Sequence, residues 1–526
     1  MREHGTEGGG PLRWWETRAF ALFLVLASAI PLMWPDIPPL VDLPGHMARY
    51  RVQLEIGESD ALRRFYNFEW ALIGNLGVDL LVIPLSKLVG LETAVKLIVM
   101  ATPPMTAAGL LWVAREVHGR LPPTAAFAVP FAYNYPFFFG FVNFALSMAL
   151  ALLAFALWLR LARYGRLRLR AWLFVPISAL VWLAHTFGWG MLGAMAFSAE
   201  LVRQVDMRVG FFRGAFKAGI HSLAMAPPIL LMLFWRGGDH VTGRTTDWFN
   251  WDKKLDWLIM ALRDRWELFD QASLALIALL LVVALFHRGM EYSRNLVASA
   301  IFLAIVYALL PRIVFGSAYA DMRLVPYWIA VGVIAIRLRP TAGPRLAQGL
   351  AMAAVAFMLV RTTATTVSTT LFDRDYDKEL PALRHVPHEA RLLTFVGRTC
   401  QDVWAMSRLE HLPGMATVRR RAFSNDQWSM PGAQLLTVRH GRPYYFSADP
   451  SQMVVPRRCR GELWLPIETS LAYFPRQNYD YLWLVRPPPF DPRLTQGLRP
   501  IWRSGTSVLY AVADRRQPAP PPEETQ

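Results

Sequence analysis

The sequence predicts a polytopic α-helical membrane protein with a C-terminal α/β domain outside the membrane. Of the 526 residues, 54% are hydrophobic and 20 are Trp, and the mean hydropathy is +0.27. This composition is atypical of soluble domains. Long apolar runs alternate with short basic clusters through most of the chain, whereas the composition after residue 366 is that of a soluble domain.

The formal net charge of +16 is explained by membrane topology rather than by nucleic-acid binding. Basic residues gather in short joints between apolar runs, as the positive-inside rule expects. The joints lie at 160–170, 203–217, 287–294 and 337–345, and the parity of the runs between them puts all four on one side, the cytoplasm. We therefore expect membrane lipids, and no nucleic acid, among the partners.

The apolar runs predict about eleven transmembrane helices. The expected spans are residues 19–34, 91–114, 124–139, 141–161, 172–185, 187–201, 216–235, 273–286, 296–315, 324–336 and 346–360. The first run lacks a small-residue cleavage site, so we interpret it as an uncleaved helix. Residues 76–89 are short and interrupted by Asp79, Pro84 and Lys87. This favours a juxtamembrane or re-entrant helix over a span.

These spans define the expected domain organisation. The segments are a cytoplasmic N-terminus (1–18), a membrane domain (19–365) with a first outer loop (35–90), an outer α/β domain (366–516) and a disordered tail (517–526). In the outer domain, the runs RLLTFVG, QLLTVRH, YDYLWLV and SVLYAVA suit buried strands. Cys400 and Cys459 lie there, and an oxidising compartment would permit a disulfide between them, with two unpaired buried thiols as the alternative.

The stretch 35–51, PDIPPLVDLPGHMARYR, concentrates ionisable groups directly after the first expected span. Its prolines disfavour a helix as far as Pro44, and a helix can begin at the following glycine, so Asp42 lies at a loop-to-helix junction. Asp42 and Asp36 are candidate general bases, because a carboxylate near a low-dielectric surface can hold a proton near neutral pH. The alternative is that Asp42 caps the helix or pairs with Arg49.

Further polar residues on the outer side are candidate ligands of a phosphate group. His46 and Arg49 would share a helix face, where His46 could instead bind a divalent ion or remain a solvated interfacial side chain. His185 lies in the turn LAHTFGWG, where a buried histidine satisfied by backbone groups is the alternative. Arg323, in PRIVFGSAYADMRLVP, is positioned to bind a lipid phosphate, because its guanidinium presents a fork of donors.

Four more residues complete the candidate contacts. Arg312, Tyr319 and Asp321 surround the opening of the helix that follows Arg323. An ion pair between Asp321 and Arg323, or a lipid-headgroup anchor, is the alternative. His240 lies in the loop RGGDHVTGRTTDWF, which suits a mobile substrate flap.

Together these features resemble the GT-C superfamily of integral-membrane glycosyltransferases, which includes protein O-mannosyltransferases and lipid A aminoarabinose transferases. The resemblance covers about residues 15–365. It rests on the acidic outer loop after the first span, the split-helix turn LAHTFG and the late arginine of ADMRLVP.

The resemblance implies transfer of a sugar from a polyprenyl-phosphate-linked donor. Asp42 or Asp36 would be the base, Arg323 the ligand of the lipid phosphate, and His185 a polar contact. The two aspartates are six residues apart rather than adjacent, which leaves open whether Mg²⁺ or Mn²⁺ takes part. No Cys or His cluster has the spacing of a zinc site.

The sequence thus predicts a glycosyltransferase of the bacterial inner membrane that transfers a hexose or pentose to a glycan, lipid or protein of the cell envelope, at the periplasmic face. A transporter or flippase of a lipid-linked glycan is one alternative. It predicts charges along a path at mid-membrane depth and related halves, and the sequence has no detectable internal repeat. A non-catalytic glycan-binding scaffold of the same fold is the other alternative.

Overall fold

A computed structural model describes residues 11–236, 244–430, 434–441, 445–459 and 463–516. The chain divides into two compact units. The first comprises residues 1–34, 72–81 and 96–369, and the second comprises residues 35–71, 82–95 and 370–526. The first outer loop therefore contributes most of its residues to the same unit as the C-terminal part of the chain.

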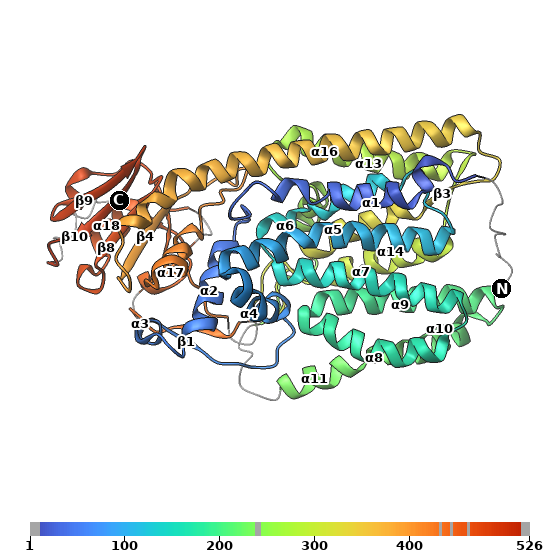
Figure 1. Cartoon of the computed structure of the whole chain (residues 1–526), viewed down its shortest axis with the longest axis horizontal. Coiled ribbons are helices and arrows are strands. Elements are labelled where there is room, and N and C mark those ends of the chain that lie inside the picture. The colour runs from blue at the N-terminus through green and yellow to red at the C-terminus, as the bar shows by residue number, and fades with distance from the viewer. Residues whose placement is uncertain (1–10, 237–243, 431–433, 442–444, 460–462, 517–526) are drawn as a thin grey trace. The chain divides into compact units, whose positions relative to one another are not determined.

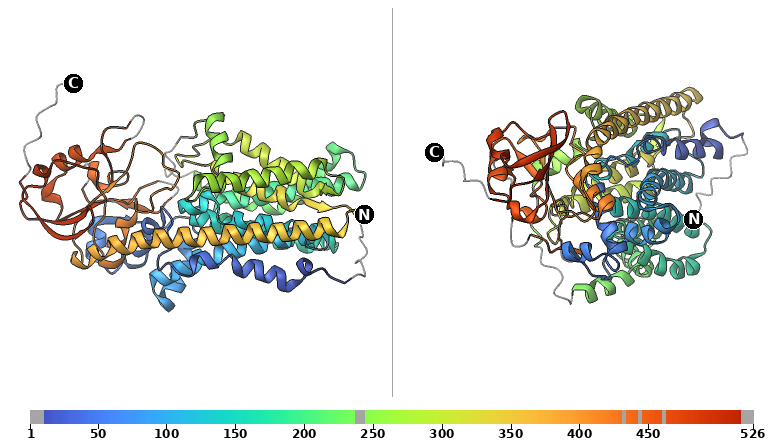
Figure 2. Two further views of the ribbon diagram at one scale, coloured as in Figure 1. Left: turned by 90° about the horizontal axis from the view of Figure 1, so that it is seen from above. Right: turned by 60° about the vertical axis from the view of Figure 1, so that its left-hand side comes forward.

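The first unit is a bundle of α-helices (Figures 1 and 2). It contains α1 (Arg18–Ala27), α7 (Val142–Arg163), α8 (Leu167–Ala184), α9 (Thr186–Asp206), α10 (Phe211–Ser222), α11 (Pro227–Arg236), α12 (Trp251–Ile259), α13 (Glu267–Phe286), α14 (Arg294–Leu309), α15 (Val325–Ile334) and most of α5 (Leu91–His118) and α16 (Pro344–Glu379). Gly188 allows α9 to approach α7 closely, because a Cβ there would lie 2.5 Å from the carbonyl oxygen of Ser147. Small residues at a helix contact are typical of membrane proteins.

Among the described residues, five helices are long and apolar enough to cross a membrane, or six if the bent pair α10 and α11 is one span. The five are Leu91–His118, Val142–Arg163, Leu167–Ala184, Glu267–Phe286 and Pro344–His385. Three shorter apolar helices are Arg18–Leu32, Arg294–Leu309 and Met322–Ile334. The multi-helix membrane fold agrees with the sequence, while the count of about eleven spans stays a prediction.

The run 124–139, expected as one span, is not a continuous α-helix. It forms a 3₁₀ helix, η3 (Ala125–Ala132), and then the short α6 (Tyr135–Phe139). Pro130 and Pro136 explain the difference, because proline lacks the amide hydrogen needed for regular α-helical bonding. The segment 76–89, expected as a short helix, forms the 13-residue α4 (Gly77–Val89).

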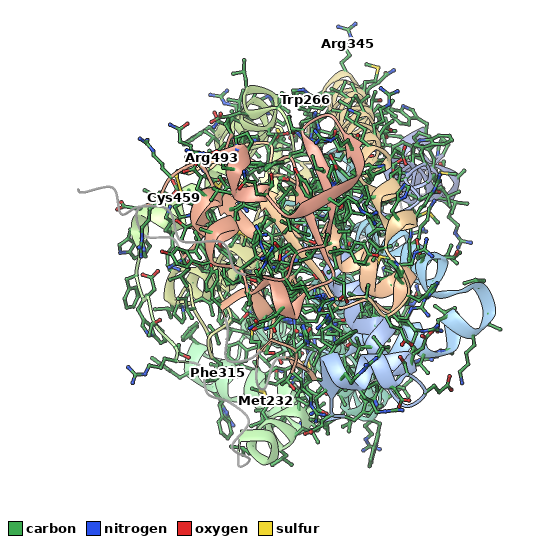
Figure 3. The ribbon with its side chains drawn as sticks, turned by 90° about the vertical axis from the view of Figure 1, so that its left-hand side faces the viewer. Met232, Trp266, Phe315, Arg345, Cys459 and Arg493 are labelled. Carbon is green, nitrogen blue, oxygen red and sulfur yellow. A yellow bond between two sulfur atoms is a disulfide. The ribbon has the colours of Figure 1, made fainter. Side chains whose placement is uncertain are left out.

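Several helices of the first unit carry exposed apolar side chains. On α13, Leu279, Leu285 and Phe286 are exposed, the last by 80%. A soluble protein rarely exposes such a row, so this face suits contact with lipid. Arg345, near the start of α16, has an exposed side chain that points away from the ribbon (Figure 3).

The second unit contains a six-stranded mixed sheet of order β7-β6-β4-β8-β10-β9 (Figure 1). The strands are β4 (Leu392–Gly397), β6 (Met453–Val455), β7 (Leu465–Pro466), β8 (Tyr481–Val485), β9 (Leu498–Ser504) and β10 (Ser507–Val512). Strands β7, β6, β4 and β8 are parallel, and β10 is antiparallel to β8 and β9. The almost wholly buried β4, LLTFVG, has the apolar composition of a central parallel strand.

The first outer loop joins this unit through a separate two-stranded sheet. In it, β1 (Tyr66–Phe68) pairs antiparallel with β5 (Leu436–Val438). Helices α2 (Leu43–Glu55) and α3 (Asp60–Phe65) precede β1, and α2 packs against α17 (Met415–Arg420). The four runs expected as strands contain β4, β5, β8 and β10, of which β5 lies outside the six-stranded sheet.

Candidate active site

Asp42 is the N-cap residue of α2 in the second unit. Pro44 occupies the first turn of this helix, where its missing N–H leaves no intrahelical bond unmade. The Asp42 carboxylate accepts no capping hydrogen bond from the helix. Instead, its Oδ1 lies 3.8 Å from Nε2 of His411. Capping therefore does not account for this side chain, which faces a histidine from a distant part of the sequence.

His411 lies directly before the 3₁₀ turn η7 (Leu412–Gly414) and is held from both sides of its ring. Its Nδ1 is 3.1 Å from the backbone carbonyl oxygen of Asp426. Because a carbonyl only accepts, Nδ1 carries a hydrogen and donates it. The carboxylate of Asp426 lies 3.7 Å from Nδ1, and that of Asp449 lies 4.0 Å from Nε2. Asp42, His411, Asp426 and Asp449 are named the His411 cluster below.

The His411 cluster favours the charged imidazole. Burial lowers the pKa of His411, but Asp426, Asp449 and Asp42 outweigh burial and raise this pKa from 6.5 to about 10. His411 is thus an imidazolium at neutral pH. The raised pKa means that the charged form of His411 stabilises the folded state. This stabilisation is complete at pH values below the ordinary histidine pKa of 6.5, and it is lost as the pH rises through about 10.

Trp428 packs beside the His411 cluster and contacts both histidines of this region. Its ring centroid lies 4.8 Å from that of His411 and 5.2 Å from that of His46. Gly45 makes this packing possible, because a Cβ there would lie 2.6 Å from the Trp428 ring. Burial, followed by the charges of Arg49 and His411, lowers the pKa of His46 well below its ordinary value. His46 is therefore neutral beside the charged His411.

His46 and Arg49 both contact aromatic side chains. The His46 ring stacks on Tyr50 at 6.4 Å, and its buried Nδ1 has no hydrogen-bond partner within the described part of the chain. The Arg49 guanidinium lies 4.9 Å from the Tyr50 ring centroid. The predicted roles of His46 and Arg49 as phosphate ligands stay predictions.

Asp36, the second candidate base, lines a cavity of about 290 Å³ in the second unit. The charged residues around it include Asp373, Asp377, Arg384 and Arg420. No member of the His411 cluster lines this cavity. The two candidate bases thus have different surroundings: Asp42 faces an imidazolium, whereas Asp36 lies in an open pocket of mixed charge.

In the first unit, His185 separates α8 from α9 as the LAHTFG pattern predicts. Its Nδ1 accepts a hydrogen bond of 3.1 Å from the backbone N–H of Phe187 and so caps α9. This is a structural role close to the alternative of a histidine satisfied by backbone groups. The acceptor state of Nδ1 leaves Nε2 as the nitrogen that bears hydrogen in the neutral ring.

Arg323 lies near His185 among aromatic rings. The guanidinium carbon is 4.3 Å from the ring centroid of Phe141, 5.8 Å from that of Phe144 and 5.5 Å from that of Phe187. The His185 ring lies 5.7 Å from both Phe144 and Phe187. The structure therefore brings two predicted site residues of the first unit together around the same two phenylalanines.

Asp321 and Arg312 each form an ion pair with a residue that is distant in the sequence. Asp321 Oδ2 is 3.2 Å from Nζ of the buried Lys254, which also donates to the carbonyl oxygens of Tyr307 and Leu310. Arg312 forms an ion pair with Asp247. These contacts give both residues structural roles and leave their predicted ligand roles untested.

The chain around Tyr319 has unusual backbone conformations. Tyr319, Phe315 and Asp247 have positive φ angles of 62°, 52° and 64°. Non-glycine residues rarely adopt this left-handed region, and such conformations concentrate at functional sites. The Tyr319 ring lies 5.2 Å from that of Phe139, in the aromatic turn YNYPFFFG. The segment that contains Phe315 and Tyr319 directly precedes Arg323 in the sequence.

His240 and the tail 517–526 lie outside the described residues. Within the described residues, no group of three or more His, Cys, Asp or Glu side chains could hold a metal ion. The participation of Mg²⁺ or Mn²⁺ stays a prediction.

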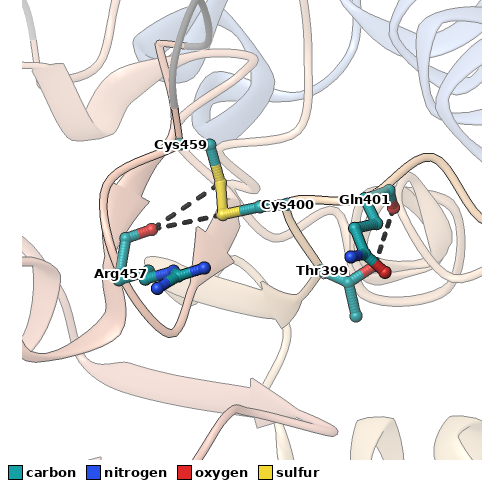
Figure 4. The surroundings of a disulfide bond; sticks show 5 residues. All are labelled: Thr399, Cys400, Gln401, Arg457 and Cys459. Atoms are coloured by element: carbon teal, nitrogen blue, oxygen red, sulfur yellow. Dashed lines mark hydrogen bonds between the residues drawn. A yellow bond between two sulfur atoms is a disulfide. The ribbon is translucent and has the colours of Figure 1, made fainter.

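The structure joins Cys400 and Cys459 in a disulfide, whose sulfurs lie 3.5 and 3.6 Å from the carbonyl oxygen of Arg457 (Figure 4). The disulfide closes a loop that contains His411, Asp426 and Asp449. Sequence reasoning missed these three residues. The adjacent Glu and His of RLEHLPG, between the two cysteines, were the available signal, and it is a weak one.

Comparison with known proteins identifies a solved structure of similar fold. No protein-family model and no curated protein matches the sequence. The structure is similar to that of ArnT from Cupriavidus metallidurans in the apo state, with a TM-score of 0.51 and 13% identity, covering 94% of this chain and 97% of that chain. The structure of the same protein bound to undecaprenyl phosphate has the same identity and coverage and a TM-score of 0.48. The chain is thus similar in fold to ArnT, a GT-C family aminoarabinose transferase.

Proposed function

We propose that this protein is a GT-C-type glycosyltransferase of the bacterial inner membrane. It transfers a sugar from a polyprenyl-phosphate-linked donor to a glycan, lipid or protein of the cell envelope at the periplasmic face. The observation that carries the proposal is the similarity to the ArnT fold over 94% of this chain. ArnT itself has been crystallised with undecaprenyl phosphate. Since one fold can host several functions, the proposal also depends on named residues.

The proposed topology has about eleven spans within residues 19–365, with residues 1–18 in the cytoplasm and residues 366–516 in the periplasm. The parity of the basic joints supports this orientation. The disulfide between Cys400 and Cys459 supports an oxidising compartment for the C-terminal domain.

In the proposed reaction, an acceptor hydroxyl attacks the anomeric carbon of the donor sugar. The new C–O bond forms as the bond to the phosphate oxygen breaks, and the leaving polyprenyl phosphate keeps the electron pair. Asp42, with Asp36 as the alternative, accepts the proton of the hydroxyl. Arg323 stabilises the charge that develops on the phosphate. His185, Arg312, Tyr319 and His240 are proposed contacts of the donor.

The test uses the purified protein in lipid nanodiscs with a polyprenyl-phosphate-linked sugar. Release of polyprenyl phosphate, followed by mass spectrometry, measures transfer. Asp42→Asn is expected to lower kcat about 10²- to 10⁴-fold, because an amide cannot accept the proton of the hydroxyl. Asp60→Asn is the matched control, since Asp60 is an aspartate of the same unit with 89% of its side chain exposed.

Asp36→Asn decides between the two candidate bases. A smaller loss in Asp36→Asn than in Asp42→Asn assigns the base to Asp42, and the reverse order assigns it to Asp36. Unchanged transfer in both variants contradicts the assignment of a base in this loop. Binding of undecaprenyl phosphate without transfer of any sugar tested favours the scaffold alternative.

A further inference from the structure

We propose that His411 is a positioning residue for Asp42, keeping that carboxylate ionised and oriented through an ion pair across Nε2. This inference rests on the proposed function of Asp42 as the base. It adds a residue from the C-terminal part of the chain to a site that the sequence located in the first loop.

The ring of His411 has one anchored nitrogen and one nitrogen that faces charge. Nδ1 donates to the carbonyl oxygen of Asp426, which fixes the plane of the ring. Nε2 then faces two carboxylates, with Oδ1 of Asp42 at 3.8 Å and Oδ1 of Asp449 at 4.0 Å. Both distances exceed that of a hydrogen bond, so the contact is electrostatic. An anchored ring is suited to orienting the Asp42 carboxylate.

Three other ionisable groups lie close to His411 or on the helix that carries Asp42. Glu410, its sequence neighbour, forms an ion pair with Arg398. His46, on the same helix that carries Asp42, is held neutral, as its lowered pKa indicates. Arg49 lies over Tyr50 on that helix. The carboxylates that face the ring are therefore those of Asp42, Asp426 and Asp449.

The ion pair has a consequence for the pH dependence of transfer. A cation within about 4–6 Å of a carboxylate lowers the pKa of that carboxylate by about one to three units. Removing the cation therefore makes Asp42 protonate at higher pH. The acid limb of the pH–rate profile should move upward by about one unit, while the donor KM changes little.

The experiment compares pH profiles of kcat/KM for the wild type, His411→Gln and His411→Asn in nanodiscs. His411→Asn keeps an N–H that can reach the Asp426 carbonyl oxygen, so it separates loss of charge from loss of the anchor. His385→Gln is the matched control, since His385 is an exposed histidine of the same unit. We expect both His411 variants, and not the control, to shift the acid limb upward.

A readout independent of activity is the NMR titration of labelled histidines. Asp42→Asn should lower the pKa of His411 from about 10, because one of its facing charges is removed. Asp60→Asn should leave this pKa unchanged. A His411 pKa that is the same in Asp42→Asn and in the wild type overturns the inference.

The outcomes for the two proposals are distinct. Transfer that needs Asp42, with an acid limb unmoved in both His411 variants, overturns the role of His411 and leaves the proposed function standing. If the wild-type protein transfers no sugar, the proposed function fails. In that case the NMR titration alone decides whether Asp42 and His411 form the pair.

Discussion

Two cations of this protein, one in each unit, differ in the contacts that hold them. His411 in the second unit faces three carboxylates. Arg323 in the first unit lies over the rings of Phe141, Phe144 and Phe187 and donates to the Ser317 hydroxyl and the Ala318 carbonyl oxygen. The carboxylates balance the imidazolium charge, whereas the rings and the two oxygens around Arg323 orient its guanidinium group.

The difference separates two uses of a buried positive charge. A cation surrounded by carboxylates lowers their pKa values and orients them, or stabilises the fold. A cation that lies over aromatic rings can be oriented by them to attract an anionic ligand. Lys254 of the first unit belongs to the former kind, since it pairs with Asp321. Substituting one cation of each kind should therefore affect different measurements.

The largest expected effect is on stability, at Lys254. Lys254→Met removes the partner of the fully buried Asp321 carboxylate, and breaking such a pair costs about 3–5 kcal/mol of unfolding free energy. Chemical denaturation in detergent micelles measures this loss. The neighbouring Lys253→Met is the control, because Lys253 is half-exposed and should change stability by less than about 0.5 kcal/mol. Equal stability of the two variants would show that the Lys254–Asp321 pair does not stabilise the fold.

A smaller effect, on binding rather than stability, is expected at Arg323. Arg323→Gln should weaken the binding of undecaprenyl phosphate about 10- to 100-fold, because a hydrogen bond to a charged group contributes about 1.5–3 kcal/mol. Arg323→Lys should weaken this binding less, because lysine keeps the positive charge although it lacks the forked N–H donors of the guanidinium group. Microscale thermophoresis in nanodiscs measures the Kd, with the exposed Arg294→Gln as the control. A large loss of stability with an unchanged Kd would show that Arg323, like Lys254, stabilises the fold and does not bind the lipid phosphate.

The smallest expected effect concerns the packing behind His411. In Gly45→Ala, the added methyl would lie 2.6 Å from the Trp428 ring, and overpacking of this kind costs about 1–3 kcal/mol. The melting temperature should fall accordingly. Gly57→Ala is the control, because nothing lies within 4 Å of a Cβ at that position. A melting temperature unchanged in Gly45→Ala would show that α2 and Trp428 can separate at little cost.

Local patterns predicted much of the architecture. The apolar runs RLLTFVG and YDYLWLV contain β4 and β8, and the long run around LAHTFG is divided at His185. Each of these features depends on residues close together in the sequence. The run 124–139 was the exception. Hydropathy predicted one span there, but hydropathy takes no account of Pro130 and Pro136, which lack the amide hydrogen needed for α-helical hydrogen bonds.

The partners of the site residues could not be predicted in the same way. Asp42 and His411 are separated by most of the chain, and no periodicity links them. Lys254 lies in the mixed-charge helix WDKKLDWLI, where the sequence does not distinguish it from the exposed Lys253. Asp321 is two residues from Arg323, so sequence proximity suggested an ion pair within that segment, whereas the structure pairs Asp321 with Lys254.

The disulfide gives the His411 cluster a dependence on cellular location. Cys400 and Cys459, 59 residues apart, enclose three of its four members, leaving only Asp42 outside the covalent loop. Closing a loop of this length removes unfolded-chain entropy equivalent to about 4 kcal/mol. A chain that has not yet reached an oxidising compartment lacks this constraint. In the proposed topology, the cluster gains this stabilisation only after the C-terminal domain has reached the periplasm.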